Sequence, residues 1–562
     1  MQRDAEVRLS PRAADLPPGI GEEGFRIRSV SPDAVEIAAG NDAGCANGVY
    51  DFMVKSRVEQ LTDPFSHEWD VQESPGWAER RVAVAAYVMG LTRLTPDMWD
   101  FTDWKAYVDF LRGLNAGRLT IMGVHQYHPE AEETQRNQWR LDNYRKLIAY
   151  AHEQGMKINL LTCYNQVPPS VYWRHPEGRT EPIRGYFGNV LCWSKAKDII
   201  MKHLVYLMEY LEGLDGIEIM VTEPLGWCLC ERCAPNMAAV WVDAVKEIGT
   251  AFRRVNPKGE IVFWNWLMAY LPVLRGIYPP TTKAQNLDRF QGYVLENLPE
   301  DTVLMDLSKN QVRISHGERF DFTGSDEILE TGAAKGFQTI NYMFYMDKEF
   351  GMVDRASIFP KPFLDMTVEE FEYTEKLPVS GVCSYRLAPP GRFLSDFLFL
   401  RMAWDPGRSR EEIVNETAGY LSRGPEDRKR IAEAVGAIER YWHERRREDL
   451  VSAARALGTA SSHPAYLQTV RLRKDLEILT MVDEYARITA GIEEARKRRE
   501  DAEALIAKRE EKLREVFEVM KGDPLYQGFT ADALWEPRAI AMQLRPRMDM
   551  WANYINHRGY YD

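Results

Sequence analysis

The stretch Ile217-Glu218-Ile219-Met220-Val221-Thr222-Glu223-Pro224 has the composition of a buried β-strand that ends in a carboxylate. Apolar residues fill most of it, which is typical of a parallel strand that is covered on both faces. In an α/β barrel the residues at the carboxyl ends of the strands share one cleft, and reactions take place there. If the chain supplies seven more strands of this kind, Glu223 is expected at the rim of such a barrel.

Eight short apolar runs follow one another along the middle of the chain. They alternate with longer amphipathic stretches, such as residues 104–114 and 240–252, as expected for successive βα units. The runs are residues 82–89, 119–125, 158–164, 217–222, 261–267, 303–307, 339–345 and 382–387. Their number predicts an α/β fold with a (β/α)8 TIM barrel.

Segments of a different character flank the predicted barrel, which we place at residues 76–390. Residues 1–75 contain two short alternating segments, a glycine-rich turn and a helical stretch, and they predict a small α+β domain. Strand-like runs stop beyond about residue 390. Residues 391–562 are therefore expected to form an all-helical C-terminal domain.

Composition and charge limit the partners that we expect. A net charge of −13 and an isoelectric point near 5.5 exclude nucleic acid, because phosphate binding would require a concentrated basic face. No apolar run approaches the roughly 18 residues that a membrane span needs, and the first residues lack the apolar core of a signal peptide. We therefore expect a cytoplasmic protein without a membrane partner. The alternative that an export signal has been removed from the chain remains open. Charges alternate at helical spacing in residues 493–512, which predicts a solvated helix face and leaves a homo-oligomer contact open.

Polar and aromatic residues stand at or just past the predicted strand ends, where they would line one pocket. Aromatic rings stack on the C–H faces of sugars, and amides and carboxylates bind sugar hydroxyls, so this set predicts a carbohydrate substrate. Trp264 and Asn265 are neighbours in one strand and point to opposite faces, so only one of them can face the pocket. The residues that we expect to bind substrate are His125, Asn165, Trp227, Trp264, Asn265, Tyr342, Tyr345 and Arg386.

Glycoside hydrolysis needs a carboxylic acid that protonates the departing oxygen, and a second carboxylate or a substrate group that acts at the anomeric carbon. Glu223 is the candidate acid, because the apolar strand and Trp227 would raise its pKa by desolvation. Asp306 is the candidate base or nucleophile. Two alternatives remain open: Glu223 could pair with Arg386 or another cation across the barrel, and Asp306 could cap a loop or a helix.

Three cysteines follow closely in the segment Cys228-Leu229-Cys230-Glu231-Arg232-Cys233. Three thiols within six residues indicate a structural zinc loop, and Cys192 in the preceding βα connection can supply the fourth ligand. The chain has seven cysteines, a sparse and odd number that speaks against a disulfide framework. Free or redox-labile thiols without metal are the alternative. We expect no cofactor to be required for catalysis.

The order of these parts resembles known sugar-cleaving enzymes. The turn Gly40-Asn41-Asp42-Ala43-Gly44, the helix start Gly48-Val49-Tyr50 and the barrel that follows are similar to the family 20 hexosaminidases and the family 67 α-glucuronidases. The latter also add a helical C-terminal domain. The segments Leu191-Cys192-Trp193-Ser194, Thr222-Glu223 and Cys228 to Cys233 resemble a group of bacterial barrel proteins that includes family 163 endo-acting N-acetylglucosaminidases. The resemblance implies a bacterial glycosidase.

The resemblance also bears on the mechanism. Family 20 enzymes carry an Asp-Glu pair at the end of strand 4, whereas Thr222 precedes Glu223 here. The family 67 pattern, with an acid Glu on strand 4 and bases on strands 6 and 7, implies Glu223, Asp306 and Asp347. We therefore expect a glycosidase that cleaves an oligosaccharide or glycoconjugate with two carboxylates. An inactive carbohydrate-binding barrel and a substrate-assisted N-acetylhexosaminidase-like enzyme remain open.

Overall fold

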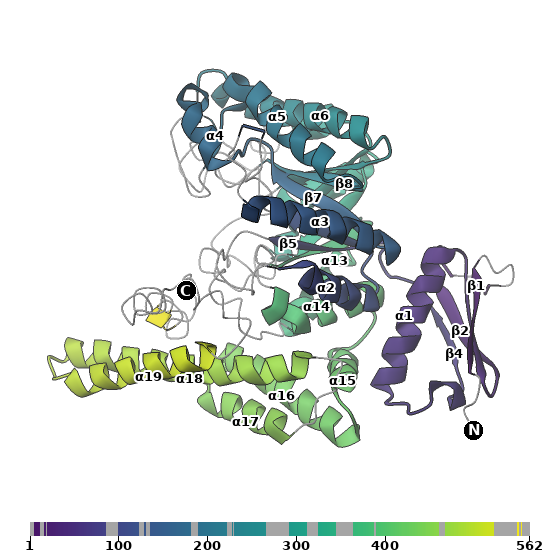
Figure 1. The fold of residues 1–562 in the computed structure, drawn as a ribbon, viewed down its shortest axis with the longest axis vertical. Helices are drawn as coiled ribbons and strands as arrows, with labels where there is room; N and C mark the ends of the chain where they lie inside the picture. Colours follow the sequence, from purple (N-terminus) through teal and green to yellow (C-terminus); the bar gives the residue numbers. More distant parts are fainter. Residues whose placement is uncertain are drawn as a thin grey trace.

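In the computed structural model the chain forms a closed barrel that is joined to a small sheet domain and to a group of long helices. Figure 1 shows the sheet domain to the right of the barrel and the C-terminal helices below it. The structure describes residues 5–11, 16–17, 20–85, 99–122, 129–130, 135–180, 189–221, 228, 230–265, 291–311, 324–343, 364–386, 389–459, 467–521, 548–549 and 552.

Eight parallel strands form the barrel in chain order, and the last pairs with the first. They are β5 (Glu79–Ala85), β6 (Arg118–Met122), β7 (Lys157–Cys163), β8 (Gly216–Met220), β9 (Glu260–Asn265), β10 (Thr302–Asp306), β11 (Thr339–Met343) and β12 (Gly381–Arg386). The pairing of β12 with β5 runs from Gly381 opposite Glu79 to Arg386 opposite Val84. Each of the eight apolar runs overlaps a strand, and the predicted TIM barrel is confirmed.

Helices in the connections between strands flank the barrel. They are α2 (Phe101–Gly113), α3 (Gln135–Glu153), α4 (Pro169–Arg174), α5 (Trp193–Tyr210), α6 (Met237–Val255), α9 (Tyr293–Asn297), α11 (Gly324–Ala334) and α13 (Leu364–Thr374). Asp100 begins α2 with a capping box, in which its side chain accepts from the amides of Thr102 and Asp103. The amphipathic stretches at residues 104–114 and 240–252 fall in α2 and α6, as predicted.

The N-terminal domain is a four-stranded sheet with one helix. Its strands β1 (Glu6–Pro11), β2 (Phe25–Ser31), β3 (Ala34–Ala39) and β4 (Asp70–Glu73) lie in the order β1-β3-β2-β4, and α1 (Asp42–Val58) packs against them. The helix approaches closely at Gly48, where an added Cβ would lie 2.5 Å from Ile37 Cγ2. The predicted strands and helix are present. The strand β1 was not expected because it is short, and its side chains, Val7 and Leu9 included, are largely exposed.

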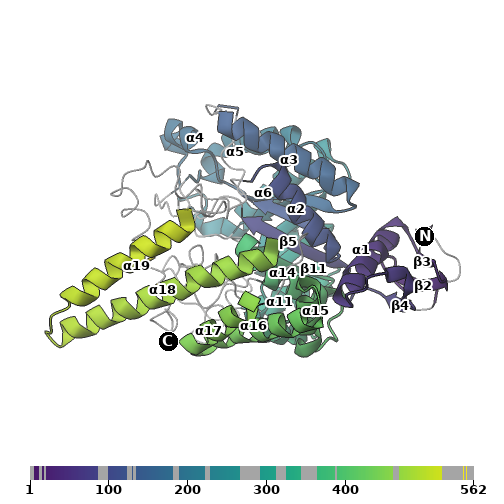
Figure 2. The same cartoon turned by 60° about the horizontal axis from the view of Figure 1, so that its bottom comes forward.

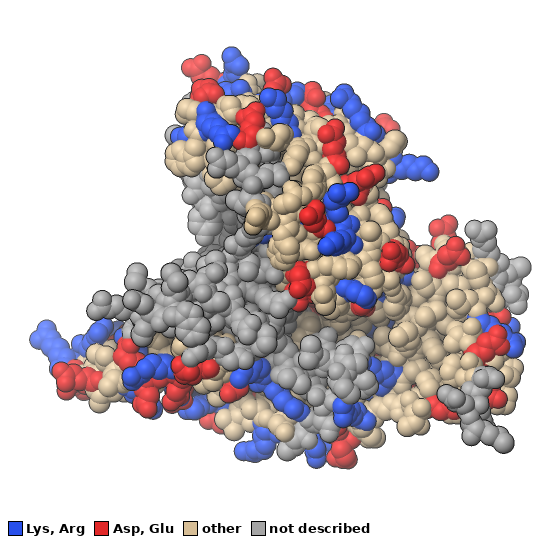
Figure 3. All heavy atoms as spheres, viewed as in Figure 1, with Lys and Arg blue, Asp and Glu red and all other residues tan. Residues whose placement is uncertain are grey.

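The C-terminal region contains helices only, among the residues that the structure describes there. They are α15 (Arg410–Leu421), α16 (Pro425–Glu444), α17 (Arg447–Thr459), α18 (Leu467–Lys497) and α19 (Glu503–Lys521). Figure 2 shows α18 and α19 side by side as a long pair. Charges of both signs are interspersed over this region in Figure 3. No helix in the described part of the chain has the length and apolarity of a membrane span.

One helix, α14 (Pro389–Trp404), contacts all three parts of the molecule. It packs against β5 and β12 of the barrel and against α15, and its first residue lies at the boundary that we placed at residue 390. Its Arg401 pairs with Asp51 of α1 at 3.2 Å and with Glu416 of α15 at 2.9 Å. All three side chains are buried, so this ion cluster joins the domains in the interior.

The end of the barrel interior where the strands begin is filled by charged side chains. Arg81 of β5 donates two hydrogen bonds to Glu260 of β9, at 2.7 and 2.8 Å, and its Nε lies 3.1 Å from Glu79. Arg118 of β6 lies 3.4 Å from Glu260 and 3.5 Å from Glu79. These side chains come from three strands, so the ion pairs cross the barrel and help to fix the order of its strands.

A third carboxyl group, that of Glu218 in β8, lies inside the same network. It accepts from Thr120 at 2.7 Å and from Asn159 at 2.9 Å, and it lies 3.7 Å from Arg81. Burial raises the pKa of Glu218, which favours its neutral form. When Glu218 is neutral, the positive charges of Arg81 and Arg118 balance the negative charges of Glu79 and Glu260. Gly216 leaves room for this arrangement, since an added Cβ would lie 2.6 Å from Asn159 Oδ1.

Replacing Arg81 with methionine is expected to lower the free energy of unfolding by about 3–5 kcal/mol, because Glu79 and Glu260 would lose their main buried cation. Urea unfolding followed by circular dichroism measures the change. As the control, Lys105→Ala breaks an ion pair with Asp109 in which both side chains are 45% exposed, and it should cost no more than about 1 kcal/mol. Equal effects of the two substitutions would contradict the structural role of the buried network.

Candidate active site

Three aromatic side chains meet inside the barrel near the carboxyl ends of its strands. Trp264 of β9 contacts Tyr342 of β11 edge to face, with ring centroids 4.5 Å apart, and Tyr385 of β12 at 6.2 Å. The two tyrosine rings lie 5.8 Å apart. All three side chains are buried, and Tyr385 also contacts the sulfur of Met122 through its hydroxyl. We call Trp264, Tyr342 and Tyr385 the aromatic floor, because they close the barrel interior below the rim.

The neighbours Trp264 and Asn265 do point to opposite faces of β9. Trp264 faces the interior, and Asn265 lies on the other face, where its Nδ2 donates to Asp306 Oδ2 at 2.6 Å. The second oxygen of Asp306 accepts from the backbone amide of Leu307 at 2.8 Å. Asp306 is only 2% exposed. The carboxylate therefore lies between the ends of β9 and β10, on the face away from the aromatic floor.

Asn165 follows the end of β7 and is fully buried. Its side-chain Nδ2 donates to the backbone carbonyl of Leu191 at 3.0 Å. The backbone carbonyl of Asn165 accepts from the backbone amide of Leu191 at 3.0 Å. Asn165 thus holds the segment that leads into Cys192 and α5. The contacts that the structure describes give Asn165 a positioning role beside the rim.

Several predicted site residues lie outside the described part of the chain. These are Glu223, His125, Trp227 and Tyr345, and of Arg386 only the backbone, at the end of β12, is described. The strand β8 ends at Met220, so Glu223 follows it by three positions in the sequence. Their assignments as acid and substrate ligands stay predictions.

A buried carboxyl group that we did not anticipate lies behind the rim. Glu370 of α13 accepts from Ser308 Oγ at 2.6 Å, from Asn341 Nδ2 at 2.8 Å and from Asn310 Nδ2 at 2.9 Å. Burial raises the pKa of Glu370 to about 7, although these hydrogen bonds oppose the shift. The group ties α13 to β11 and to the turn that follows β10. No sequence signal marked it, because a glutamate in an amphipathic helix is ordinarily solvated.

An exposed tryptophan was also missed. Trp173 lies on α4, in the connection after β7, and its side chain is 67% exposed. Arg179 lies over its ring at 4.6 Å and over that of Tyr172 at 4.4 Å. The connections that follow the strands border the active cleft in barrels of this type, so Trp173 offers a flat apolar surface on that side of the molecule.

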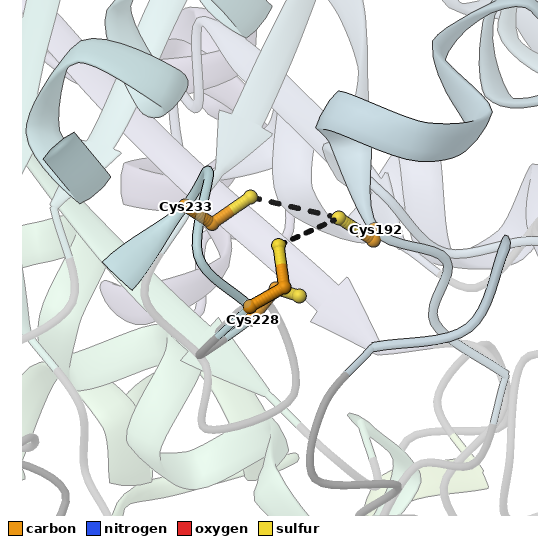
Figure 4. A group of neighbouring side chains, drawn as sticks. Cys192, Cys228 and Cys233 are labelled. Carbon is orange, nitrogen blue, oxygen red and sulfur yellow. Dashed lines mark hydrogen bonds between the residues drawn. The ribbon is translucent and has the colours of Figure 1, made fainter. Parts of the chain in front are cut away.

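The four predicted metal ligands are brought together. Cys192 precedes α5, and Cys228, Cys230 and Cys233 lie between β8 and α6. Figure 4 shows the sulfur atoms of Cys192 and Cys233 turned toward each other from these two segments. Hydrogen bonds with Cys192 and Cys228 lower the pKa of Cys233, and hydrogen bonds with Cys228 and Cys233 raise the pKa of Cys192. The side chains come from neighbouring connections of the barrel, as the spacing predicted.

No protein-family model and no curated protein sequence matches this chain. Solved structures do share its fold. One is a glycoside hydrolase of family 138 that targets the pectin rhamnogalacturonan II; it is 10% identical, with a TM-score of 0.55 over 98% of this chain and 93% of that one. Another is a family 115 4-O-methyl-α-glucuronidase with specificity for decorated arabinogalactans; it is 13% identical, with a TM-score of 0.57 over 98% of this chain and 72% of that one. The fold is therefore that of barrel-type glycoside hydrolases.

The free energy of unfolding is expected to decrease as the pH rises from about 4.5 to about 7, because of Glu370. A buried carboxyl whose pKa is raised from 4.5 to about 7 contributes fully below its unfolded pKa, and this contribution is lost by the time the pH has risen through 7. The loss amounts to about 3 kcal/mol. Urea unfolding of the wild type and of Glu370→Gln at several pH values isolates the effect, since glutamine does not titrate. Parallel pH profiles for the two proteins would contradict it.

Proposed function

We propose that this protein is a glycosidase that uses Glu223 as the general acid. The observation that carries the proposal is the position of β8 as the fourth strand of a closed barrel, with Glu223 three residues beyond its end. Strand ends at this face of a TIM barrel supply the catalytic groups. The fold shared with two glycoside hydrolases supports the same conclusion.

The aromatic floor and Trp173 support a carbohydrate substrate. The floor fills the barrel interior with packed aromatic rings near the carboxyl ends of the strands. Trp173 exposes its ring in the connection after β7, where it can stack on the C–H face of a sugar. An apolar base beside a carboxyl group also raises the pKa of that group, which a general acid requires near neutral pH.

Asp306 fits a positioning role better than direct attack on the substrate. Both of its oxygens accept hydrogen bonds, one from Asn265 and one from the amide of Leu307. A base must reach the attacking water, and a 2% exposed carboxylate on the face away from the aromatic floor reaches it only after rearrangement. We therefore propose that Asp306 orients the strand ends around the cleft.

The substrate that we propose is a branched acidic plant glycan. Of the two enzymes compared above, one targets the pectin rhamnogalacturonan II, and the other is a 4-O-methyl-α-glucuronidase with specificity for decorated arabinogalactans. Both glycans serve as test substrates, with the released sugars separated by anion-exchange chromatography.

Replacing Glu223 with glutamine is expected to lower turnover of the cleaved glycan by about 10²–10⁴-fold, because the amide cannot donate a proton to the leaving oxygen. Initial rates of sugar release measure the loss. Glu212→Gln is the matched control: Glu212 is exposed in the turn between α5 and β8, and its activity should equal that of the wild type. Turnover of Glu223→Gln within tenfold of the wild type would refute the assignment. Binding of either glycan without any release would instead identify an inactive carbohydrate-binding barrel.

Replacing Asp306 with alanine separates the two roles of this residue. In a positioning role the substitution leaves Asn265 Nδ2 and the Leu307 amide without acceptors, and it should lower the free energy of unfolding by about 1–3 kcal/mol. Activity should fall because the cleft is distorted, and Asp306→Asn should restore part of both properties. A catalytic role predicts the reverse pattern, in which Asp306→Asn keeps full stability and loses as much activity as Glu223→Gln.

A further inference from the structure

We propose that Cys192, Cys228, Cys230 and Cys233 bind one Zn²⁺ ion in a tetrahedral structural site that ties two neighbouring barrel connections together.

The geometry of the four sulfur atoms fits a tetrathiolate site. Their sulfur atoms all lie within 4.8 Å of one another, and all four side chains are buried. The Cys192 sulfur lies 3.5 Å from that of Cys233 and 3.8 Å from that of Cys230. A tetrahedron with Zn–S bonds of about 2.3 Å has S–S edges of about 3.8 Å. These two distances are close to such an edge, and the other sulfur–sulfur distances stay within 4.8 Å, so all four side chains can reach one shared ion.

These distances do not fit disulfide bonds. A disulfide has an S–S distance of about 2.05 Å, and all seven cysteines of the chain are free thiols. Four buried thiols that face one another, without a metal, would place weakly polar groups in contact with little gain in free energy. A shared Zn²⁺ converts the same arrangement into four strong bonds.

The two segments that carry the ligands lead into helices that pack against each other. Cys192 directly precedes α5, and Cys233 lies four residues before the first residue of α6. Ser194 adds a hydroxyl contact to the Cys233 sulfur at 3.1 Å.

The backbone around the ligands is also held in place. The amides of Cys233 and Ala234 both donate to the carbonyl of Cys230 at 3.0 Å, which forms a tight turn between two of the ligands. On the other side, the amide of Cys192 donates to the carbonyl of Gly178 at 2.7 Å. A site with ligands on two preformed segments loses little conformational entropy when it binds the ion.

The ion would join the connection after β7 to the connection after β8. Cys228 stands five positions after Glu223 in the sequence, so the site fixes the chain shortly beyond the proposed acid. The zinc site would fix the position of these two connections and would take no part in the reaction. The proposal of a zinc site therefore does not depend on the proposed glycosidase activity.

Metal analysis of the full-length protein tests the proposal. We expect about one zinc ion per chain by inductively coupled plasma mass spectrometry, and less than about 0.2 in Cys230→Ser or Cys233→Ser. Growth with Co²⁺ should give the visible absorption bands of a tetrahedral cobalt tetrathiolate. Cys45→Ser is the matched control, because Cys45 is a buried thiol in the N-terminal domain, and it should keep the zinc content of the wild type.

A second measurement does not depend on the folding of the variants. Titration of the wild-type protein with a mercurial reagent should release one zinc ion for about four thiols modified, read with a coloured zinc indicator. Stripping the ion with a chelator should lower the melting temperature, and added Zn²⁺ should restore it. Purified protein with less than about 0.2 zinc per chain after growth in zinc-supplemented medium, iron in place of zinc, or a disulfide among these cysteines would each overturn the proposal.

Discussion

Closure of the barrel is the constraint on which the rest of the structure depends. Once β12 pairs with β5, the register of eight parallel strands decides for every strand residue whether it faces the interior or the helices. Charged residues such as Arg81 and Glu260 then meet at one end of the interior, and Trp264 and Tyr342 meet near the other. A shift of one strand by one residue would expose the ion network to the helix layer and move the aromatic floor out of the barrel.

Much of this architecture could be predicted because buried parallel strands leave a simple signal. Continuous apolar runs mark them, and all eight runs overlap strands. The charged interior left no comparable signal. Arg81 and Glu218 stand inside or beside apolar runs, and their mutual compensation depends on partners that are distant in sequence. The edge strand β1 was missed for the opposite reason, since it pairs through its backbone while its side chains stay exposed.

The candidate site likewise contains some features that the sequence predicts and others that only the folded structure shows. Alternation along β9 correctly separated Trp264 from Asn265, but only the packed structure could show that Asn265 and Asp306 face each other on the helix side. The cysteine spacing identified Cys192 as the partner of a distant cluster, because few other residues could complete four thiolates. Glu370 could not be predicted. Its three polar partners from outside α13 come from the turn that follows β10 and from β11, and only the folded chain brings them to it.

The helix α14 links the sheet domain to a residue far along the chain. Trp404 stacks on Phe25 with ring centroids 5.7 Å apart and donates to Glu73, so it is part of the hydrophobic core of the N-terminal domain. During synthesis the residues of the sheet domain leave the ribosome before those of the barrel, yet their core contains Trp69 alone and lacks Trp404 until the whole barrel has been translated. The sheet domain is therefore completed only after the barrel that follows it, and its unfinished core is open to aggregation in the meantime.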